Sequence, residues 1–289
     1  KVVLMRKEIT FMSLKHLFTV LCFLIFNNAI GQECFWSKQI KGGKEESCSA
    51  VVTDPAGNIY AAGVFNSTFL YFETDTFSTG AYNNIFLVKY DASGNELWAK
   101  HFLGGGAATS IKYNSYDNSI LISGSFWGQL NLGDTIIYGD ADYDAFVLKT
   151  DINGNTIWCR SGGGIGCDWG YDVTFDDDGN IYFSGECPYT ATFGSQQIDG
   201  GGFLAKYSAA GELFWVKKKF RMTKVFFYQE CEAVPKNLQF IGDTLLVFGT
   251  THNDTIVIDT FQFLFPDIFT SSASFIGYFN KDGNLIKMN

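Results

Sequence analysis

Proline and histidine are scarce in this chain, and no stretch is apolar for long enough to cross a bilayer. Among 289 residues there are 4 prolines and 3 histidines. The main apolar run, residues 17–26, is far shorter than the about 20 residues that a membrane-spanning helix needs. No Cys-x-x-Cys, Gly-x-Ser-x-Gly or His-Glu-x-x-His sequence occurs. These absences argue against a zinc site, a serine-hydrolase elbow and a zincin protease, and we expect no cofactor.

Aromatic residues and glycine are abundant instead. The chain contains 29 Phe, 14 Tyr and 31 Gly, and 46% of its residues are hydrophobic. Aromatic residues favour strands, and glycine favours the tight turns between them. The composition therefore predicts an all-β protein with a large core.

The N-terminal residues have the pattern of an export signal. Lys15 and His16 precede the apolar run, and Ala29 and Gly31 are small residues at the positions that signal peptidase recognises. We expect residues 1–11 to be an upstream extension before Met12, with cleavage after Gly31. A membrane anchor or a buried strand is the alternative. The expected location of the mature chain is secreted or at the cell surface, with no transmembrane segment.

The charge balance disfavours polyanionic partners. Residues 1–31 carry a net charge of +3, so their removal from a chain of −9 leaves −12. Nucleic acids and anionic membranes attract clustered positive charge. The one basic run, residues 217–224, is more typical of a solvated strand end. We therefore expect no nucleic-acid partner.

The cysteine count fits an exported protein. Six cysteines follow the cleavage site, and an even number in an exported chain suggests disulfides. Proximity in sequence favours three pairs: Cys34 with Cys48, Cys159 with Cys167, and Cys187 with Cys231. Metal binding is the competing interpretation, but the spacing that a metal site requires is absent.

Three markers recur along the chain at intervals of about 60 residues, the sign of a repeat architecture. The first is a glycine that ends a strand, the second is a Phe-x-x-Lys-like strand, and the third is a tryptophan. The markers are Gly63, Gly124, Gly185 and Gly249; Phe86, Phe146, Phe203 and Phe275; and Trp98, Trp158 and Trp215, with Trp36 at the same spacing before them. The chain therefore contains four copies of one unit.

Each unit is predicted to hold four short strands, which in the first copy fall near 50–53, 58–64, 85–90 and 96–102. A sheet of this size cannot bury both faces alone, so neighbouring sheets must stack, and radial stacking gives a β-propeller. The predicted blades are 49–103, 107–163, 170–220 and 231–289. A linear β-solenoid is the alternative, but its repeats are shorter. Residues 34–41 are expected to form a Trp-bearing closing strand, which suggests a fragment of a larger ring.

A turn of the form Asp-x-x-Gly-Asn separates the first two strands of a unit, as at Asp54 to Asn58. The aspartate is expected to cap backbone N–H groups, and the glycine to take the left-handed conformation. Asn118 replaces the glycine in the second copy, and asparagine tolerates the same conformation.

These residues resemble the secreted bacterial β-propeller repeat of the Bacteroidetes type. The signature is Asp-x-x-Gly-Asn-Ile-Tyr-x-x-Gly followed by Asp-x-Phe-x-x-Lys-x-Asp-x-x-Gly, and the similarity covers residues 34 to 289. The fourth copy departs from it, with Tyr278 in place of Lys and Gly242-Asp243 in place of the first turn. The resemblance implies an exported propeller.

Catalytic candidates are few. His101 and His252 are the histidines of the mature chain, and both are expected to be exposed turn residues. Asp176 to Asn180 superficially resembles a calcium loop, but the closing Glu of an EF-hand is missing, so Asp176, like Asp54, is expected to cap a turn. The glycine runs 104–106 and 162–164 lack the Lys-Ser/Thr of a phosphate loop and follow the tryptophan of their units.

Residues that break the repeat are the best functional candidates, because repeated ones serve the architecture. These are Trp127, Asp168, Trp169, Tyr171 and Asp172. Exposed aromatic rings beside carboxylates suit the capture of a carbohydrate or a peptide, while plain packing is the alternative. We expect a non-catalytic binding or scaffold module for an extracellular glycan or protein. The alternative is a glycan hydrolase or lyase, because propeller enzymes bring acidic pairs together from distant blades.

Overall fold

The computed structural model describes residues 36–78, 83–220, 222–225, 228–231, 233–251, 255–258, 261–264 and 273–289. Contacts divide the chain after Lys38, and every strand named below lies in the second part, Gln39–Asn289. Among the described residues, no helix has the length and apolar character needed to cross a membrane. Residues 1–31, the predicted extension and signal peptide, lie outside the described residues.

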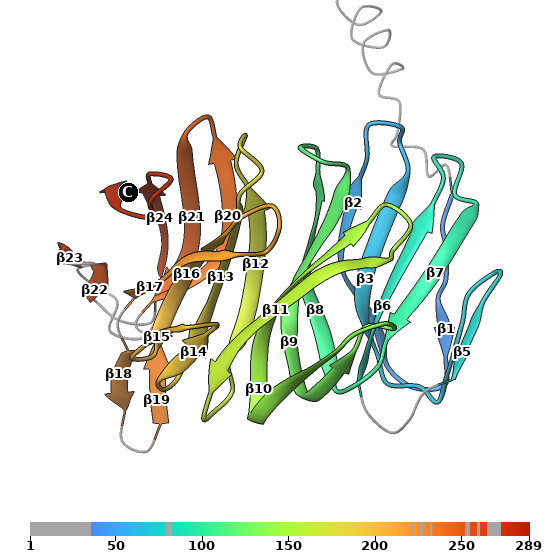
Figure 1. Ribbon diagram of the computed structural model, residues 1–289, viewed down its shortest axis with the longest axis horizontal. Helices are drawn as coiled ribbons and strands as arrows, with labels where there is room; N and C mark the ends of the chain where they lie inside the picture. Colours follow the sequence, from blue (N-terminus) through green and yellow to red (C-terminus); the bar gives the residue numbers. More distant parts are fainter. Residues whose placement is uncertain are drawn as a thin grey trace, which may run out of the picture. The chain divides into compact units, whose positions relative to one another are not determined.

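Four antiparallel four-stranded blades follow one another along the chain, and the second and third are each extended by a hairpin to a six-stranded sheet (Figure 1). The first blade contains β2 (Glu46–Thr53), β3 (Ile59–Phe65), β6 (Asn84–Tyr90) and β7 (Glu96–Phe102). The second contains β8 (Gly106–Asn114), β9 (Ser119–Asn131), β10 (Ile136–Asp151) and β11 (Thr156–Gly164). The third contains β12 (Trp169–Phe175), β13 (Ile181–Cys187), β16 (Gly201–Tyr207) and β17 (Leu213–Phe220). The fourth contains β20 (Ala233–Ile241), β21 (Thr244–Thr251), β24 (Ala273–Phe279) and β25 (Leu285–Met288).

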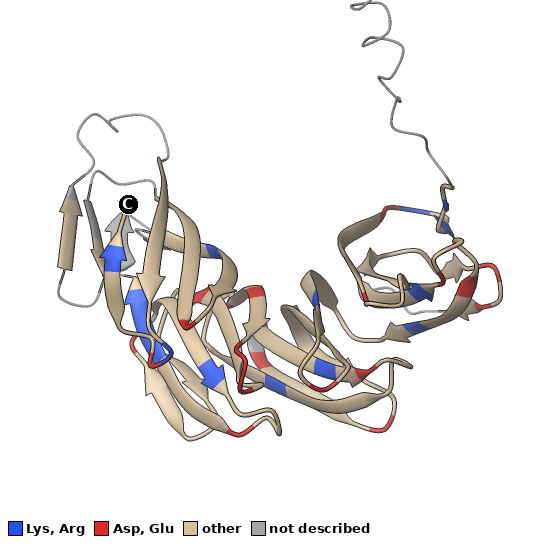
Figure 2. Cartoon of the chain, turned by 90° about the horizontal axis from the view of Figure 1, so that it is seen from above, with Lys and Arg blue, Asp and Glu red and all other residues tan. Residues whose placement is uncertain are grey.

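The sheets pack through their faces, which confirms the prediction of an all-β propeller of four-stranded blades. Figure 2 shows the same sheets from above. Each large apolar cluster joins two neighbouring blades: Leu87 with Ile122, Val147 with Phe203, and Leu204 with Val247. The first strands also lie next to one another in chain order, β2 by β8, β8 by β12 and β12 by β20. The core is therefore built between blades, and no blade completes it alone.

A β-bulge and a glycine mark the same place in every blade. The first strand bulges at Ser49, Thr109, Tyr171 and Lys236, and one residue before each bulge it pairs with Gly63, Gly124, Gly185 and Gly249. On its other side each glycine pairs with the marker phenylalanine. A Cβ on Gly124 would stand 2.7 Å from the Phe146 ring and closer still to the Ala107 carbonyl. The glycine recurs because a backbone carbonyl of the first strand, next to its bulge, and the ring of the marker phenylalanine occupy the space that a side chain would need.

The repeated turns form as predicted. Asp54 Oδ1 accepts hydrogen bonds from the backbone N–H groups of Ala56 (3.0 Å) and Asn58 (2.9 Å). Gly57 has a φ of 81°, and Asn118 has a φ of 54°, the one positive value among the described non-glycine residues. Asp176 caps its turn in the same way, so these carboxylates serve the backbone.

The tryptophan and lysine markers tie each blade to the next. Trp98, Trp158 and Trp215 lie over the turn glycines Gly154, Gly211 and Gly283 of the following blade, where a Cβ would meet the indole ring. The marker lysines Lys89, Lys149 and Lys206 donate to backbone carbonyls of the same turns, at 3.4, 2.8 and 3.3 Å. The second signature therefore describes a contact between blades, which explains why its residues recur together.

The hairpin between the second and third strands of a blade pairs with the last strand of the blade before it. β14 (Ala191–Phe193) and β15 (Gln196–Ile198) extend the second sheet through β11, while β22 (Thr255–Ile258) and β23 (Phe261–Leu264) extend the third through β17. In the first junction, Leu103 bridges to Asn131 of the β9–β10 hairpin. Each pair of blades is thus joined by backbone hydrogen bonds as well as by apolar contact.

A strand was expected over residues 34–41, but residues 36–40 form none. The short strand that follows them still pairs with a hairpin, as the last strands of the blades do. β1 (Lys41–Gly42) pairs with β4 (Phe69–Tyr71), which in turn pairs with β5 (Thr76–Ser78). Lys41 lies five residues after Trp36, as Leu103 does after Trp98. β1 therefore lies beside the hairpin of the first blade in the position that the end of a last strand has beside the hairpins of the later blades. A further hairpin, β18 (Met222–Val225) with β19 (Tyr228–Cys231), precedes the fourth blade.

The marker glycines should not tolerate a side chain. We expect Gly124→Ala to lower the free energy of unfolding by about 1–3 kcal/mol, because the added methyl group collides with the Ala107 carbonyl and the Phe146 ring. Urea denaturation followed by tryptophan fluorescence measures the change. Gly43→Ala is the matched control, since no atom lies within 4 Å of its added Cβ. Equal midpoints for the two variants would contradict this account.

Candidate functional site

The two ends of the blades differ in what they carry. Antiparallel order places the starts of the first and third strands and the ends of the second and fourth at one end of each blade. We call this the junction end, because the chain passes there from one blade to the next. The repeated turns lie at the opposite end. The candidates Trp127, Asp168 and Trp169 all lie at the junction end of the second and third blades.

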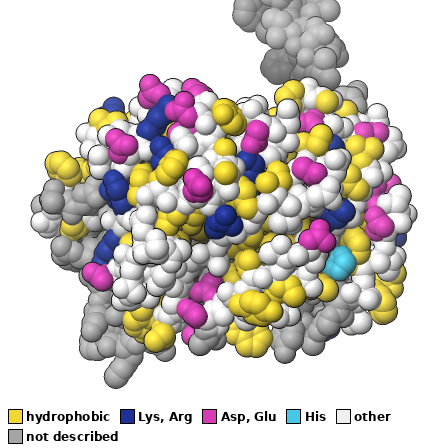
Figure 3. Space-filling view, viewed as in Figure 1, with side chains coloured by type: hydrophobic (Ala, Val, Ile, Leu, Met, Phe, Trp, Pro, Cys, Tyr) yellow, Lys and Arg dark blue, Asp and Glu magenta, His cyan; other side chains and the backbone are white. Residues whose placement is uncertain are grey.

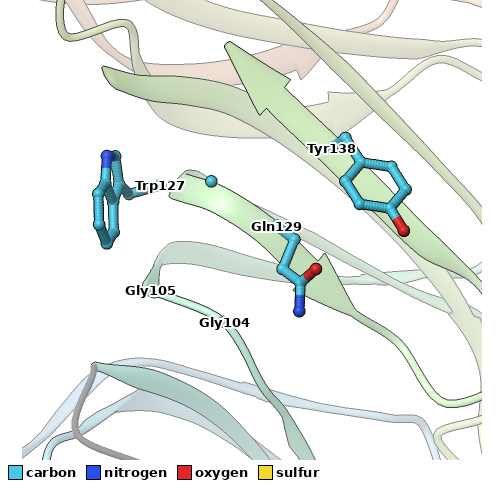
Figure 4. A pocket seen from close by; sticks show the side chains of 6 residues that line it. Gly104, Gly105, Trp127, Gln129 and Tyr138 are labelled. Carbon is cyan, nitrogen blue, oxygen red and sulfur yellow. The ribbon is translucent and has the colours of Figure 1, made fainter. Parts of the chain in front are cut away.

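A cavity of about 420 Å³ lies beside Trp127 on the β9–β10 hairpin. Figure 4 shows the Trp127 ring at one side of it and the Gln129 and Tyr138 side chains at the other, with Gly104 and Gly105 between them. Trp127 is 43% exposed and Tyr138 is 71% exposed. The cavity therefore presents two aromatic rings and one amide to solvent.

The floor of this cavity must be glycine. A Cβ on Gly105 would stand 2.8 Å from the Trp127 carbonyl, and one on Gly104 would overlap the Gln129 carbonyl. Both residues also have positive φ, 121° for Gly104 and 63° for Gly105. The run at residues 104–106, which superficially resembles a phosphate loop, is thus explained by the hairpin that crosses it.

Trp127 continues into a row of three aromatic side chains that links the two blades. Trp127 lies opposite Tyr143 in the register of β9 and β10. Tyr143 stacks on Trp169 of the third blade, with the ring centroids 5.1 Å apart and the planes at 22°. Trp169 remains 36% exposed. The sequence prediction that Trp127 and Trp169 are exposed is correct, and the structure adds Tyr143 between them.

Two buried carboxyl groups belong to the residues next to these rings in the chain. Asp144 follows Tyr143 and Asp168 precedes Trp169, and their side chains are only 4% and 1% exposed. Both converge on Gly163: a Cβ there would overlap Asp144 Oδ1 and stand 2.7 Å from Asp168 Oδ2. Asp144 Oδ2 accepts from the Asp140 N–H at 2.6 Å, and Asp168 Oδ2 accepts from the Gly164 N–H at 2.8 Å. Asp168 Oδ1 is buried with no hydrogen-bond partner among the described residues.

Burial raises the pKa of both groups. It raises the pKa of Asp168 to about 7, with a further increase from the Asp144 and Asp140 carboxylates and an opposing effect from the Gly164 N–H and the Cys187 thiol. It raises the pKa of Asp144 to about 6, with Asp140 and Asp142 adding to the effect and the Asp140 N–H opposing it. Two adjacent carboxyl groups in a dry site disfavour double ionisation, so the pair binds protons near neutral pH.

The preceding junction has the same backbone but no acids. There the Gly106 N–H donates to the Asn83 carbonyl at 3.0 Å, as the Asp168 N–H donates to the Tyr143 carbonyl at 2.6 Å. Asn84 therefore corresponds to Asp144, and Gly106 to Asp168. Asn84 accepts from the Gly104 N–H at 3.1 Å without carrying a charge. The acid pair is a local change at one junction and not a requirement of the fold.

The remaining two candidates, Tyr171 and Asp172, make contacts between blades. Asp172 accepts from the Ser110 hydroxyl of the second blade and from the Leu238 N–H of the fourth at 2.7 Å, while Lys112 lies 3.7 Å away. Its side chain is 1% exposed. Tyr171 donates to Glu186, and Lys236 lies 3.5 Å from the centre of its ring. Asp172 thus ties three blades together, which favours packing over ligand capture.

The predicted disulfide between Cys159 and Cys167 is wrong. Both are free thiols, Cys159 buried on β11 and Cys167 exposed in the loop that follows. Cys48 and Cys187 are also free, so the predicted pairs Cys34–Cys48 and Cys187–Cys231 are wrong as well, and the Cys187 thiol interacts with the Asp168 carboxyl instead. Cys34 and the side chain of Cys231 lie outside the described residues. Proximity in sequence failed here because Cys159 points into the core between blades.

His101 has no acid or nucleophile paired with it in the described contacts. Its ring packs against Phe77 at 4.3 Å between centroids, and burial lowers its pKa. It lines a second cavity of about 420 Å³ with Lys100, Asp134 and Thr156. His101 is therefore half-buried on β7 and not an exposed turn residue. His252 lies outside the described residues.

Metal and polyanion sites find little support in the described part of the chain. No group of three or more His, Cys, Asp or Glu side chains is arranged to hold a metal ion there. In Figure 3, Lys and Arg side chains are scattered among acidic and apolar ones on the face shown. In the basic run, Lys219 is buried and Lys217 donates to the Asp282 carbonyl, so the run does not form one basic surface.

Four site residues escaped prediction: Gln129, Tyr138, Tyr143 and Asp144. Asp144 stands two residues before the marker Phe146, inside the repeated signature, and so was assigned to the architecture. The other three lie in or beside the connecting hairpin, whose length and sequence vary between units. One signal was available, because the first copy has neutral Asn84 where the second has Asp144.

The acid pair should make the stability of the protein depend on pH. A carboxyl whose pKa is raised by folding stabilises the protein below its unfolded pKa, and that contribution is lost as the pH rises through the folded pKa. We expect Asp168→Asn to be more stable than the wild type at about pH 8, by on the order of 2 kcal/mol, with the difference vanishing toward about pH 4. Thermal and urea unfolding across this range measure it. Asp177→Asn, an exposed residue at the turn end of the third blade with the same charge change, should show no such trend; a constant difference for Asp168→Asn would refute the pairing.

Known proteins add the following. No family model matches the chain. An uncharacterized WD repeat-containing protein of Acanthamoeba polyphaga mimivirus is 27% identical over 128 residues, which cover 39% of this chain and 9% of that protein. The chain thus spans about a tenth of the length of this relative. Among solved structures, a GH43 endo-arabinanase from Bacillus licheniformis is similar over 86% of this chain and 80% of its own, with 12% identity and a TM-score of 0.39. The chain is a β-propeller repeat protein.

Proposed function

We propose that this protein is a non-catalytic binding propeller that captures a carbohydrate at the junction end of its second blade. The observation that carries the proposal is the cavity lined by Trp127, Gln129 and Tyr138. Sugar rings have flat C–H faces that pack on aromatic rings, and their hydroxyl groups hydrogen-bond to amides. Two exposed rings and an exposed amide around a glycine floor supply both kinds of contact.

The rigidity of the site supports binding. Trp127 and Gln129 lie on β9, and Tyr138 on β10, of a paired hairpin, and the Trp127 N–H donates to the Gly105 carbonyl at 3.2 Å. The rings are therefore held by backbone hydrogen bonds within the second blade and to the preceding one. A pre-organised aromatic site loses little conformational freedom when a ligand binds.

A glycan hydrolase or lyase is the alternative, and the acid pair is the observation that favours it. Raised carboxyl pKa values are typical of a general acid. However, the side chains of Asp144 and Asp168 are only 4% and 1% exposed. A glycosidic bond must reach both carboxyl groups to be cleaved, and this burial prevents it. Reducing-sugar release from the polysaccharides that bind would establish the alternative.

Export is part of the proposal. The predicted signal peptide and the resemblance to secreted bacterial β-propeller repeats of the Bacteroidetes type support a location outside the cytoplasm or at the cell surface. An extracellular glycan, free or attached to a protein, is then the partner that such a site would meet. The acidic balance of the chain and its scattered lysines fit a neutral partner better than a polyanion.

Removal of one ring should weaken capture. In a screen of soluble neutral and acidic polysaccharides, we expect at least one to bind, and Trp127→Ala to raise its Kd at least about tenfold, which is about 1.4 kcal/mol. Tyr138→Ala should have a similar effect. Isothermal titration calorimetry measures both.

Phe214→Ala is the matched control for these variants. Phe214 is 49% exposed at the start of β17, at the end of the blade that carries the repeated turns. Its loss should leave Kd unchanged. Binding that survives both Trp127→Ala and Tyr138→Ala, or the absence of any glycan ligand, would refute the proposed site.

Processing tests the export proposal separately. When the full chain is expressed in a Gram-negative host, we expect cleavage after Gly31 and a mature product that begins at Gln32. N-terminal sequencing and mass measurement of the exported fraction check this, and a variant with charged residues in place of Leu21 and Leu24 should stay unprocessed in the cytoplasm. An exported product that keeps residues 1–31 would contradict the expectation.

A further inference from the structure

We propose that Asp144 and Asp168 share a proton at the junction of the second and third blades, and that loss of this proton opens the Tyr143–Trp169 stack and weakens ligand capture beside it. This regulation of the site rests on the proposed binding function. The observation behind it is that each acid is adjacent in the chain to one ring of the stack: Tyr143 precedes Asp144, and Trp169 follows Asp168.

The geometry couples the charge of the pair to the stack. The same two backbone segments carry the acids and the rings, and they are joined by the Asp168 N–H bond to the Tyr143 carbonyl at 2.6 Å. With one proton present, both carboxyl groups can lie beside Gly163, where a Cβ would overlap Asp144 Oδ1 and stand 2.7 Å from Asp168 Oδ2. With none, two like charges face each other in a site from which water is excluded, and the segments are pushed apart.

The surroundings of the pair offer no compensating cation in the described contacts. From β10 the pair faces Asp140 and Asp142, and from β13 it faces the Cys187 thiol and, through it, Glu186. β9 contributes the Phe126 ring near Gly139 and Asp144, and β11 contributes only the glycines 162–164. Additional negative charge from Asp140 and Asp142 favours retention of the proton, so its loss falls near neutral pH.

The buried Oδ1 atom of Asp168 is evidence that the carboxyl group is protonated. Asp168 Oδ1 is buried with no hydrogen-bond partner among the described residues, and the Cys187 thiol beside the carboxyl group is only a weak donor, so a full carboxylate would be poorly solvated. A neutral carboxyl group needs fewer hydrogen bonds than a carboxylate and can itself donate one. Asn84 at the preceding junction is neutral at all pH values, so the fold itself is compatible with an uncharged group in this place.

The first experiment uses the protein without ligand. Tryptophan fluorescence of the wild type, followed from about pH 5 to about pH 8.5, should show a transition as Trp169 leaves its stack on Tyr143. Asp168→Asn and Asp144→Asn each leave one carboxyl group facing a neutral amide, so no repulsion between two carboxylates can develop and both variants should lose the transition. Asp142→Asn should keep it. A transition that persists in both Asp168→Asn and Asp144→Asn would overturn the proposal.

The second experiment measures capture of the polysaccharide that binds best. Because ionisation opposes binding, the Kd of the wild type should rise about fivefold to tenfold across the same pH range, while Asp168→Asn should bind equally well at both ends. A Kd that does not change with pH in the wild type would overturn the proposal even if the fluorescence transition exists. If no polysaccharide binds at any pH but the transition is present and removed by Asp168→Asn, the proposed function fails and the proton pair stands.

A third experiment uses Ca²⁺ to test whether the acid pair holds a metal cation and not a proton. Millimolar Ca²⁺ at high pH should leave the wild-type transition unchanged if the pair holds a proton. If Ca²⁺ abolishes the transition and raises the thermal midpoint of the wild type but not of Asp168→Asn, the pair is a metal site and the proposal is wrong. The variants can be compared with the wild type only if Asp168→Asn and Asp144→Asn both unfold cooperatively. If either variant does not, the pH titration of the wild type with and without Ca²⁺ decides between a proton and a metal ion.

Discussion

The close crossing of each connecting hairpin over the last strand of the preceding blade is the constraint on which the rest of the structure depends. Backbone meets backbone there, five residues after each tryptophan, at Lys41, Leu103, Gly163 and Phe220. At two of these crossings the approach leaves no room for a further side chain: Gly104 and Gly105 lie under the second-blade hairpin, and Gly162 lies under Phe193 of β14. Apolar burial alone would let neighbouring blades slide, whereas these hydrogen bonds fix their register, and the Trp-on-glycine contact fixes their opposite ends.

This arrangement separates architecture from variation. The turn between the third and fourth strands repeats its cap and its glycine in every blade, and the first three blades repeat the lysine contact to the next such turn, because neighbouring blades must meet there in the same way. The junction end is bounded by a hairpin of variable length, so residues there can differ from one blade to the next. Trp127, Tyr138 and the Asp144–Asp168 pair all occur where that freedom exists. A repeat protein can therefore acquire a site at one junction without disturbing the contacts that hold the others.

Much of the fold could be predicted because the repeat compares the chain with itself. The predicted strands of the first copy differ from the observed ones by at most four residues at either end, and Asn118 and Trp98 have the structural roles that their spacing indicated. Gly63 was expected to end a strand and instead lies inside β3, opposite the bulge. The site was predicted in part. Trp127 and Trp169 were found because they break the pattern, but Tyr138 and Gln129 lie in a hairpin with no repeated pattern. Asp172 also breaks the pattern and proved to be a tie between blades, since a residue unique to one unit can serve a unique contact as well as a ligand. The Cys159–Cys167 pair failed for a related reason: distance along a strand and a loop says nothing about which side of the strand a thiol faces.

The pairing of Asp144 with Asp168 is the part of the molecule that the fold does not explain. Asn84 shows that a neutral amide satisfies the same backbone position, and Gly106 shows that no side chain is required opposite it. Two buried carboxyl groups destabilise the folded protein at neutral pH relative to that neutral arrangement, because folding raises their pKa values. Residues that lower stability without serving the architecture occur mainly where a protein functions. Here the acids flank the two rings that join the second blade to the third, so the local instability is placed where a small shift in the backbone changes the surface beside Trp127. The position of the charge, and not the repeat that surrounds it, is what favours this junction in the function that we propose.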